Sequence, residues 1–182
     1  FANDADLSGS GVVYGLTLNN NPTVQDLWNS TPAWGFPYAA SEIAPTPAAA
    51  TQLDGPLAQE VAGLGVYALW NDWLYGELSF YRNSQIGQNQ PPDSSNQNVI
   101  DGTAPYWRLA VEHVWGPHAV ELGTYGLNAH VFPGAGSPLK GPTNEFRDIA
   151  LDAQYQYSSG PHIISAHSTW IDEDQDWDAS FA

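Results

Sequence analysis

Residues 146–157 read Phe-Arg-Asp-Ile-Ala-Leu-Asp-Ala-Gln-Tyr-Gln-Tyr, and this stretch decides the fold class. From Ile149 onward the odd positions are apolar or aromatic, whereas the even positions carry Asp, Ala and Gln. A period of two places these two sets of side chains on opposite faces of a β-strand. After the turn sequence Ser-Ser-Gly-Pro, residues 162–171 form another apolar run, so the whole stretch predicts a β-hairpin.

The same arrangement recurs along the chain. Apolar runs flank further tight turns near Asn71 and Gly116, and long polar connections separate one hairpin from the next. The runs predict strands over residues 11–18, 57–70, 73–82, 105–115, 118–132, 146–157 and 162–171. The sequence therefore predicts an all-β fold, an antiparallel meander of about seven strands in which short and long connections alternate.

Short turns at one end and long loops at the other are typical of a transmembrane β-barrel. Aromatic residues are expected at strand ends, where they would mark the membrane interfaces. These residues are Trp70, Trp73, Trp107, Trp115, Tyr155, Tyr157 and Trp170. Isolated carboxylates on the polar faces of strands are candidates for the lumen lining, namely Glu77, Glu112, Glu121, Asp148 and Asp152. The alternative is a soluble β-sandwich, which has the same period but turns its apolar face inward.

Composition narrows the function classes. The chain has 182 residues, of which 20 are acidic and 4 are Lys or Arg, and its formal charge is −16. So few basic residues exclude a surface that follows nucleic-acid phosphates. The absence of cysteine excludes disulfides, thiolate zinc sites and covalent c-type haem. The absence of methionine indicates a processed or truncated product, and we expect an exported protein of the bacterial outer membrane, with secretion as the alternative.

The chain divides by amino-acid composition into two parts of one domain. Residues 1–56 contain one expected strand and a long loop rich in Pro, Asn and Ala, and residues 57–182 contain the hairpins. The smallest closed transmembrane barrels have about eight strands, and an open edge has no hydrogen-bond partners in lipid. We therefore expect the chain to be a segment of a larger barrel that continues beyond residue 182.

Four stretches of the chain are distinctive: VYGLTLNNNPTVQD (residues 13–26), TPAW (31–34), DGTAPYWRLA (101–110) and DAQYQY (152–157). They resemble a family of poorly characterised Gram-negative outer-membrane proteins, whose members are often labelled hypothetical or cytochrome c proteins. The resemblance implies a porin-type barrel. Some members carry a haem-attachment segment near the start, but this chain has no Cys-x-x-Cys-His and the haem does not carry over.

A terminal acidic run places carboxylates at alternate positions: Asp172, Asp174, Asp176 and Asp178. Calcium prefers several oxygen ligands from a short loop, so these four residues are candidate calcium ligands. Trp177 stands where an EF-hand loop requires Gly, and the competing interpretation is a solvated outer loop. On a bacterial surface such a loop would bridge divalent cations to lipopolysaccharide.

No catalytic motif stands out. Ser165 and His167 share a strand face without a nucleophile elbow, and Glu112 and Glu121 are expected to be cross-strand neighbours around the turn at 116–117. We expect no enzymatic activity.

The expected function is that of a porin-like, cation-preferring passive channel or a surface scaffold. Expected partners are outer-membrane lipid or lipopolysaccharide, small solutes or ions, identical copies and electron-transfer proteins, but no nucleic acid. One alternative is a secreted sandwich that binds carbohydrate or peptide through Trp-rich loops. The other is a structural subunit that assembles through its sheet edge.

Overall fold

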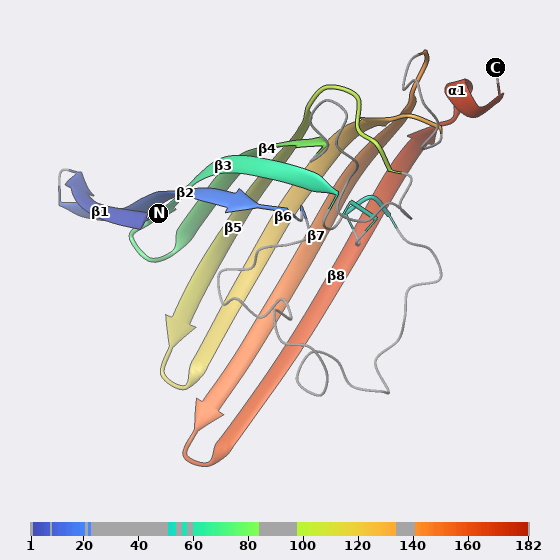
Figure 1. Cartoon of the computed structure of the whole chain (residues 1–182). Helices are drawn as coiled ribbons and strands as arrows, with labels where there is room; N and C mark the ends of the chain where they lie inside the picture. Colours follow the sequence, from blue (N-terminus) through green and yellow to red (C-terminus); the bar gives the residue numbers. More distant parts are fainter. Residues whose placement is uncertain are drawn as a thin grey trace.

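The computed structural model describes residues 2–7, 9–20, 22, 51–53, 56–57, 60–83, 98–133 and 141–181. They form one antiparallel sheet of eight strands in which each strand pairs with its neighbours in sequence (Figure 1). The elements are β1 (Ala2–Leu7), β2 (Ser10–Asn19), β3 (Val61–Trp70), β4 (Leu74–Asn83), β5 (Ala104–Trp115), β6 (His118–Val131), β7 (Asn144–Ser159), β8 (His162–Asp176) and the short helix α1 (Asp178–Phe181). No α-helix within these ranges is long and apolar enough to span a membrane.

The predicted all-β antiparallel meander is confirmed, with one strand more than the sequence indicated. The additional strand is β1, whose Asn, Asp and Ala residues give no strand signal of their own. It forms because it pairs with β2, from Ala2 opposite Gly15 to Leu7 opposite Ser10. All the described strands lie in this one sheet, so they are not arranged as a two-layer sandwich. The strands β1 and β8 are its edges and do not pair with each other, so the sheet is not closed.

The predicted alternation of short and long connections is also confirmed. Short turns join β1 to β2, β3 to β4, β5 to β6 and β7 to β8, whereas the intervening connections are long. Most of the Pro-rich loop expected before residue 56 lies outside the described residues, as do residues 84–97 and 134–140 of the two other long connections.

Most strand boundaries lie within about two residues of the prediction, and two differ by more. Strand β3 begins at Val61 rather than Leu57, because a turn in which Glu60 N donates to Leu57 O precedes it. Strand β8 does not end at Ile171 but continues to Asp176, so the predicted acidic loop is wrong. Its last residues pair with β7, where Arg147 lies opposite Asp174. Backbone pairing with a long neighbouring strand extends β8 even though its side chains are those of a loop.

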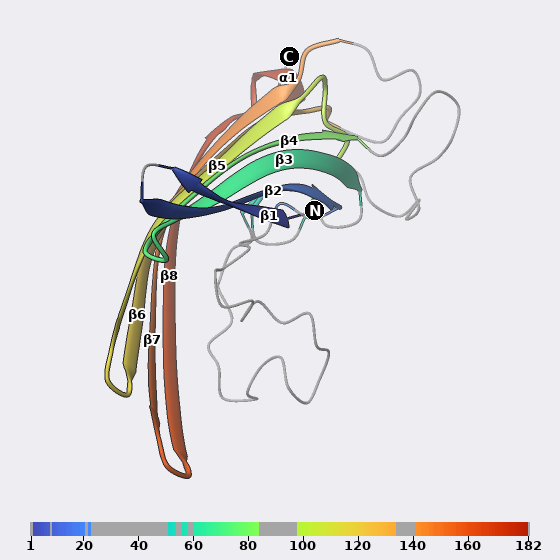
Figure 2. The ribbon, with the colours of Figure 1, turned by 90° about the vertical axis from the view of Figure 1, so that its left-hand side faces the viewer.

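The two faces of the sheet differ in a way that is unusual for a protein surrounded by water. Large apolar side chains are exposed on one face, here called the outer face; Leu109, Ile149 and Trp170 keep 54%, 57% and 58% of their accessible surface. Further exposed members of this face are Leu16, Leu18, Leu64, Val66, Leu78, Phe80, Trp107, Val111, Leu122 and Leu151. The opposite, inner face carries buried side chains, many of them polar, and is the concave face in Figure 2.

Of the aromatic residues expected at strand ends, Trp70, Trp73 and Trp115 lie beside the short turns. Trp107 and Trp170 instead lie within β5 and β8, so their placement at strand ends was wrong.

A segment between β2 and β3 folds onto the inner face. Its described residues are 51–53, 56–57 and 60, and we call it the inward segment. Leu53 and Leu57 of this segment are almost fully buried in one apolar cluster with Tyr106 and Tyr125 of the sheet. Burying each leucine contributes about 1.5–3 kcal/mol. The core of the described structure therefore lies between the inward segment and the concave side of the sheet.

The turn from β3 to β4 offers a test of the fold. Asn71 and Asp72 have φ values of 49° and 58°, the left-handed region that a tight hairpin turn requires at its centre. We expect Asp72→Gly to raise the free energy of unfolding by about 0.5–1 kcal/mol, because glycine has no Cβ to strain there. Chemical denaturation measures the change. The control Asp72→Ala removes the same carboxylate but keeps a Cβ, and a gain in stability for this variant would contradict the explanation.

Candidate functional site on the inner face

A buried arginine connects three strands on the inner face. Arg108 of β5 donates from Nη1 to Asp152 Oδ1 and from Nη2 to Asp152 Oδ2 of β7, each at 2.8 Å. Strand β6 lies between them, and its residue at the crossing point is Gly123. A Cβ on Gly123 would lie 2.4 Å from Asp152 Oδ1 and 2.8 Å from Arg108 Nη2. The bidentate pair therefore depends on a position with no side chain.

The same guanidinium binds a second carboxylate. Arg108 Nη2 donates to Glu121 Oε1 of β6 at 2.5 Å, and the guanidinium carbon lies 5.4 Å from the centre of the Tyr125 ring. The side chains of Arg108 and Glu121 are both fully buried. One positive charge facing two carboxylates leaves this cluster, Arg108 with Glu121 and Asp152, with a net negative charge.

Glu77 of β4 lies directly opposite Arg108 in the strand register. Its carboxylate accepts hydrogen bonds from two neutral hydroxyls, that of Tyr75 at 2.8 Å and that of Ser79 at 2.6 Å. Ser79 fits because Gly65 faces it from β3, where a Cβ would lie 1.9 Å from the Ser79 hydroxyl oxygen. Glycines on the inner face thus make room for the polar side chains of neighbouring strands.

Two more carboxylates hold the inward segment in place. Asp148 Oδ2 of β7 accepts from Leu53 N at 2.9 Å, and Glu173 Oε2 of β8 accepts from Gln52 N at 2.6 Å. Asp148 and Glu173 are paired across the two strands. Successive backbone N–H groups of the segment therefore meet neighbouring carboxylates of the sheet, which satisfies donors that would otherwise be buried without partners.

The five carboxylates that the sequence singled out share this face. Glu77, Glu121, Asp148 and Asp152 are buried, and Glu112 is half-buried beside Glu121, its predicted cross-strand neighbour. The sequence alone did not reveal the roles of Arg108 and Glu173. The period of two on β5 already placed Arg108 on the polar face, but its span over β6 requires the register. Glu173 was hidden within the stretch assigned to a loop.

The candidate calcium ligands do not form a ligand set. Asp172, Asp174 and Asp176 follow one another along the outer face of β8, about 6.6 Å apart along the strand, and Asp178 begins α1. Within the described ranges no group of three or more His, Cys, Asp or Glu side chains is placed to hold a metal ion. The chain contains no cysteine for covalent haem.

Comparison with family models, with curated proteins and with solved structures finds no match to this chain.

The buried cluster predicts a large difference between two arginines. We expect Arg108→Met to lower the free energy of unfolding by about 3–5 kcal/mol, because Glu121 and Asp152 would stay buried without a cation. The matched change Arg147→Met removes a guanidinium that is 60% exposed and binds Glu145, and its effect is expected to be far smaller. Denaturant titration of both variants measures this, and equal losses would contradict the assignment.

Proposed function

We propose that this chain forms part of the wall of an outer-membrane β-barrel that works as a porin-like passive channel. In this proposal lipid covers the outer face and the inner face lines the lumen. The observation that carries the proposal is the distribution of side chains, with large apolar residues exposed on one face and charged residues gathered on the other.

The outer face suits lipid better than water. Leucine, valine, isoleucine and tryptophan side chains continue across strands β2 to β8, whereas a soluble monomer rarely exposes so continuous an apolar surface. On β5 this face runs from Pro105 to Trp115, about 33 Å along the strand, which at a tilt of ~40° spans about 25 Å of membrane. Towards the start of β7 and the end of β8 this apolar band ends, and the outer positions there carry charged residues, namely Arg147, Asp172 and Asp174.

The inner face suits the passage of cations. Among the Lys and Arg residues of the described strands, only Arg108 lies on this face, and Glu121 and Asp152 already neutralise it. Glu77 and Glu173 accept hydrogen bonds from neutral groups. Carboxylates that line a lumen favour cations over anions.

The free edge of β8 is consistent with the same proposal. A strand in lipid needs hydrogen-bond partners along both edges. A further strand from a longer chain would pair with β8, and an identical copy is the other source of such a strand.

Neighbouring positions on β5 test which face meets lipid. Because the chain has no cysteine, Val111→Cys and Glu112→Cys each give one attachment point for a nitroxide label after reconstitution into lipid vesicles. We expect oxygen, which concentrates in lipid, to relax the label at 111 more strongly, and a water-soluble nickel complex to relax the label at 112 more strongly. Greater access of the nickel complex at 111 than at 112 would exclude the proposed orientation.

Ion selectivity tests the channel itself. In planar bilayers with a salt gradient, we expect the reconstituted protein to conduct with a reversal potential on the cation-preferring side. Glu112→Gln removes a half-buried inner carboxylate and should reduce this preference, whereas Asp174→Asn on the outer face should leave it nearly unchanged. Anion preference, or absence of conductance, would refute the channel proposal.

A further inference from the structure

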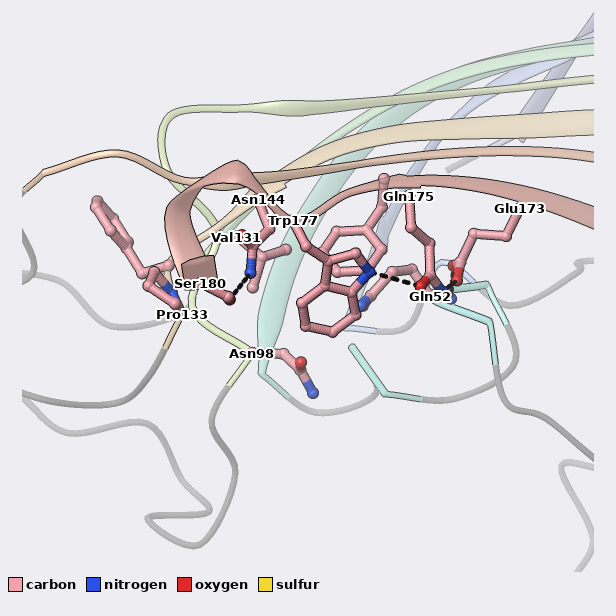
Figure 3. Close-up of a pocket in the computed structure, with 11 residues that line it drawn as sticks. Gln52, Asn98, Val131, Pro133, Asn144, Glu173, Gln175, Trp177 and Ser180 are labelled. Atoms are coloured by element: carbon pink, nitrogen blue, oxygen red, sulfur yellow. Dashed lines mark hydrogen bonds between the residues drawn. The ribbon is translucent and has the colours of Figure 1, made fainter. Parts of the chain in front are cut away.

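A small pocket opens where the inward segment meets the ends of β6, β7 and β8 (Figure 3). Its volume is about 280 Å³, which suits a solute of few heavy atoms. The lining residues used in the argument are Gln52, Asn144, Glu173, Gln175, Trp177 and Ser180. In Figure 3 the indole of Trp177 lies between Asn144 and Gln52.

Several hydrogen-bond donors of the lining are already used within the protein. Trp177 Nε1 donates to Gln175 Oε1 at 2.8 Å, and Asn144 Nδ2 donates to Ser180 Oγ at 2.7 Å. Gln175 Nε2 donates to Glu173 Oε1. These donors are therefore not available to a ligand unless a contact within the protein breaks.

Two hydrogen-bond acceptors of the pocket lining, in contrast, remain for a ligand. Within the part of the chain that the structure describes, Gln52 Oε1 and Asn144 Oδ1 have no hydrogen-bond partner, and both residues are more than nine-tenths buried. A buried acceptor without a donor costs about 1–3 kcal/mol, so a ligand that brings N–H groups to these oxygens recovers that free energy. The pocket calls for a ligand that donates hydrogen bonds.

Charge and aromatic surface point to a cation among such donors. Among the described residues that line the pocket, Glu173 is the one acidic residue. None of these described lining residues is Lys, Arg or His. The indole of Trp177, which packs edge-on against Phe146 with ring centres 5.6 Å apart, adds an aromatic face that attracts ammonium groups.

We propose that this pocket binds a short protonated alkyl diamine. One ammonium group donates to Glu173 and Gln52 Oε1, the other donates to Asn144 Oδ1, and the alkyl chain crosses the Trp177 indole. Binding is a property of the folded chain and does not require that it conducts ions, so this inference and the channel proposal fail separately.

Isothermal titration of the folded protein with 1,4-diaminobutane at physiological salt tests the proposal. We expect saturable binding of one diamine, and much weaker binding of the bis-trimethylammonium analogue, which has the charge but no N–H donors. Butane-1,4-diol and glucose are expected to bind weakly, because they lack the positive charge.

Two matched variants locate the site. Glu173→Gln keeps an oxygen for Gln52 N but removes the charge, and we expect it to weaken diamine binding about tenfold or more. Asp174→Asn removes a charge from the next residue, on the outer face, and should change the affinity less than twofold. Equal losses in the two variants, equal binding of the quaternary analogue, tighter binding of glucose, or no diamine binding would each overturn the proposal.

Discussion

A single sheet has two faces, and the rest of this structure follows from which of them is turned inward. Here the inward face carries ionised side chains, and burying a charge is costly unless a partner and hydrogen bonds compensate for it. Arg108 meets this requirement by binding Asp152 through two hydrogen bonds and Glu121 through a third. That arrangement requires a guanidinium to cross an intervening strand, and the missing side chain of Gly123 makes the crossing sterically possible.

The carboxylates on this face also position the chain that covers it. Asp148 and Glu173 accept from consecutive backbone N–H groups, and Leu53 and Leu57 then insert among the tyrosines of the sheet. Polar contacts fix the place of the inward segment, and apolar burial supplies most of its stability. The pocket beside Trp177 is a consequence of this arrangement, because its lining includes a residue of the inward segment and the ends of three strands.

The local sequence pattern predicts the hairpins, the alternating loops and the division of the β7 side chains between two faces, because each depends on a period of two and on turn residues nearby in sequence. It does not predict features that depend on pairing with another strand. Strand β1 and the last residues of β8 have side chains typical of loops, and only pairing with β2 and β7 extends the sheet to them. The span from Arg108 to Asp152 depends on the register of three strands, which the sequence of any one strand does not contain.

The acidic residues that give the chain its net charge of −16 lie in different environments in the structure. Arg108 neutralises part of the charge of Glu121 and Asp152. Asp148 and Glu173 accept hydrogen bonds from backbone N–H groups. On the outer face, beyond the apolar band, three acidic residues follow one another along β8, namely Asp172, Asp174 and Asp176. Repulsion within such a row weakens with salt because its members are exposed. The buried inner side chains are screened far less, so the electrostatic field at the inner face is set by these side chains rather than by the net charge of the chain.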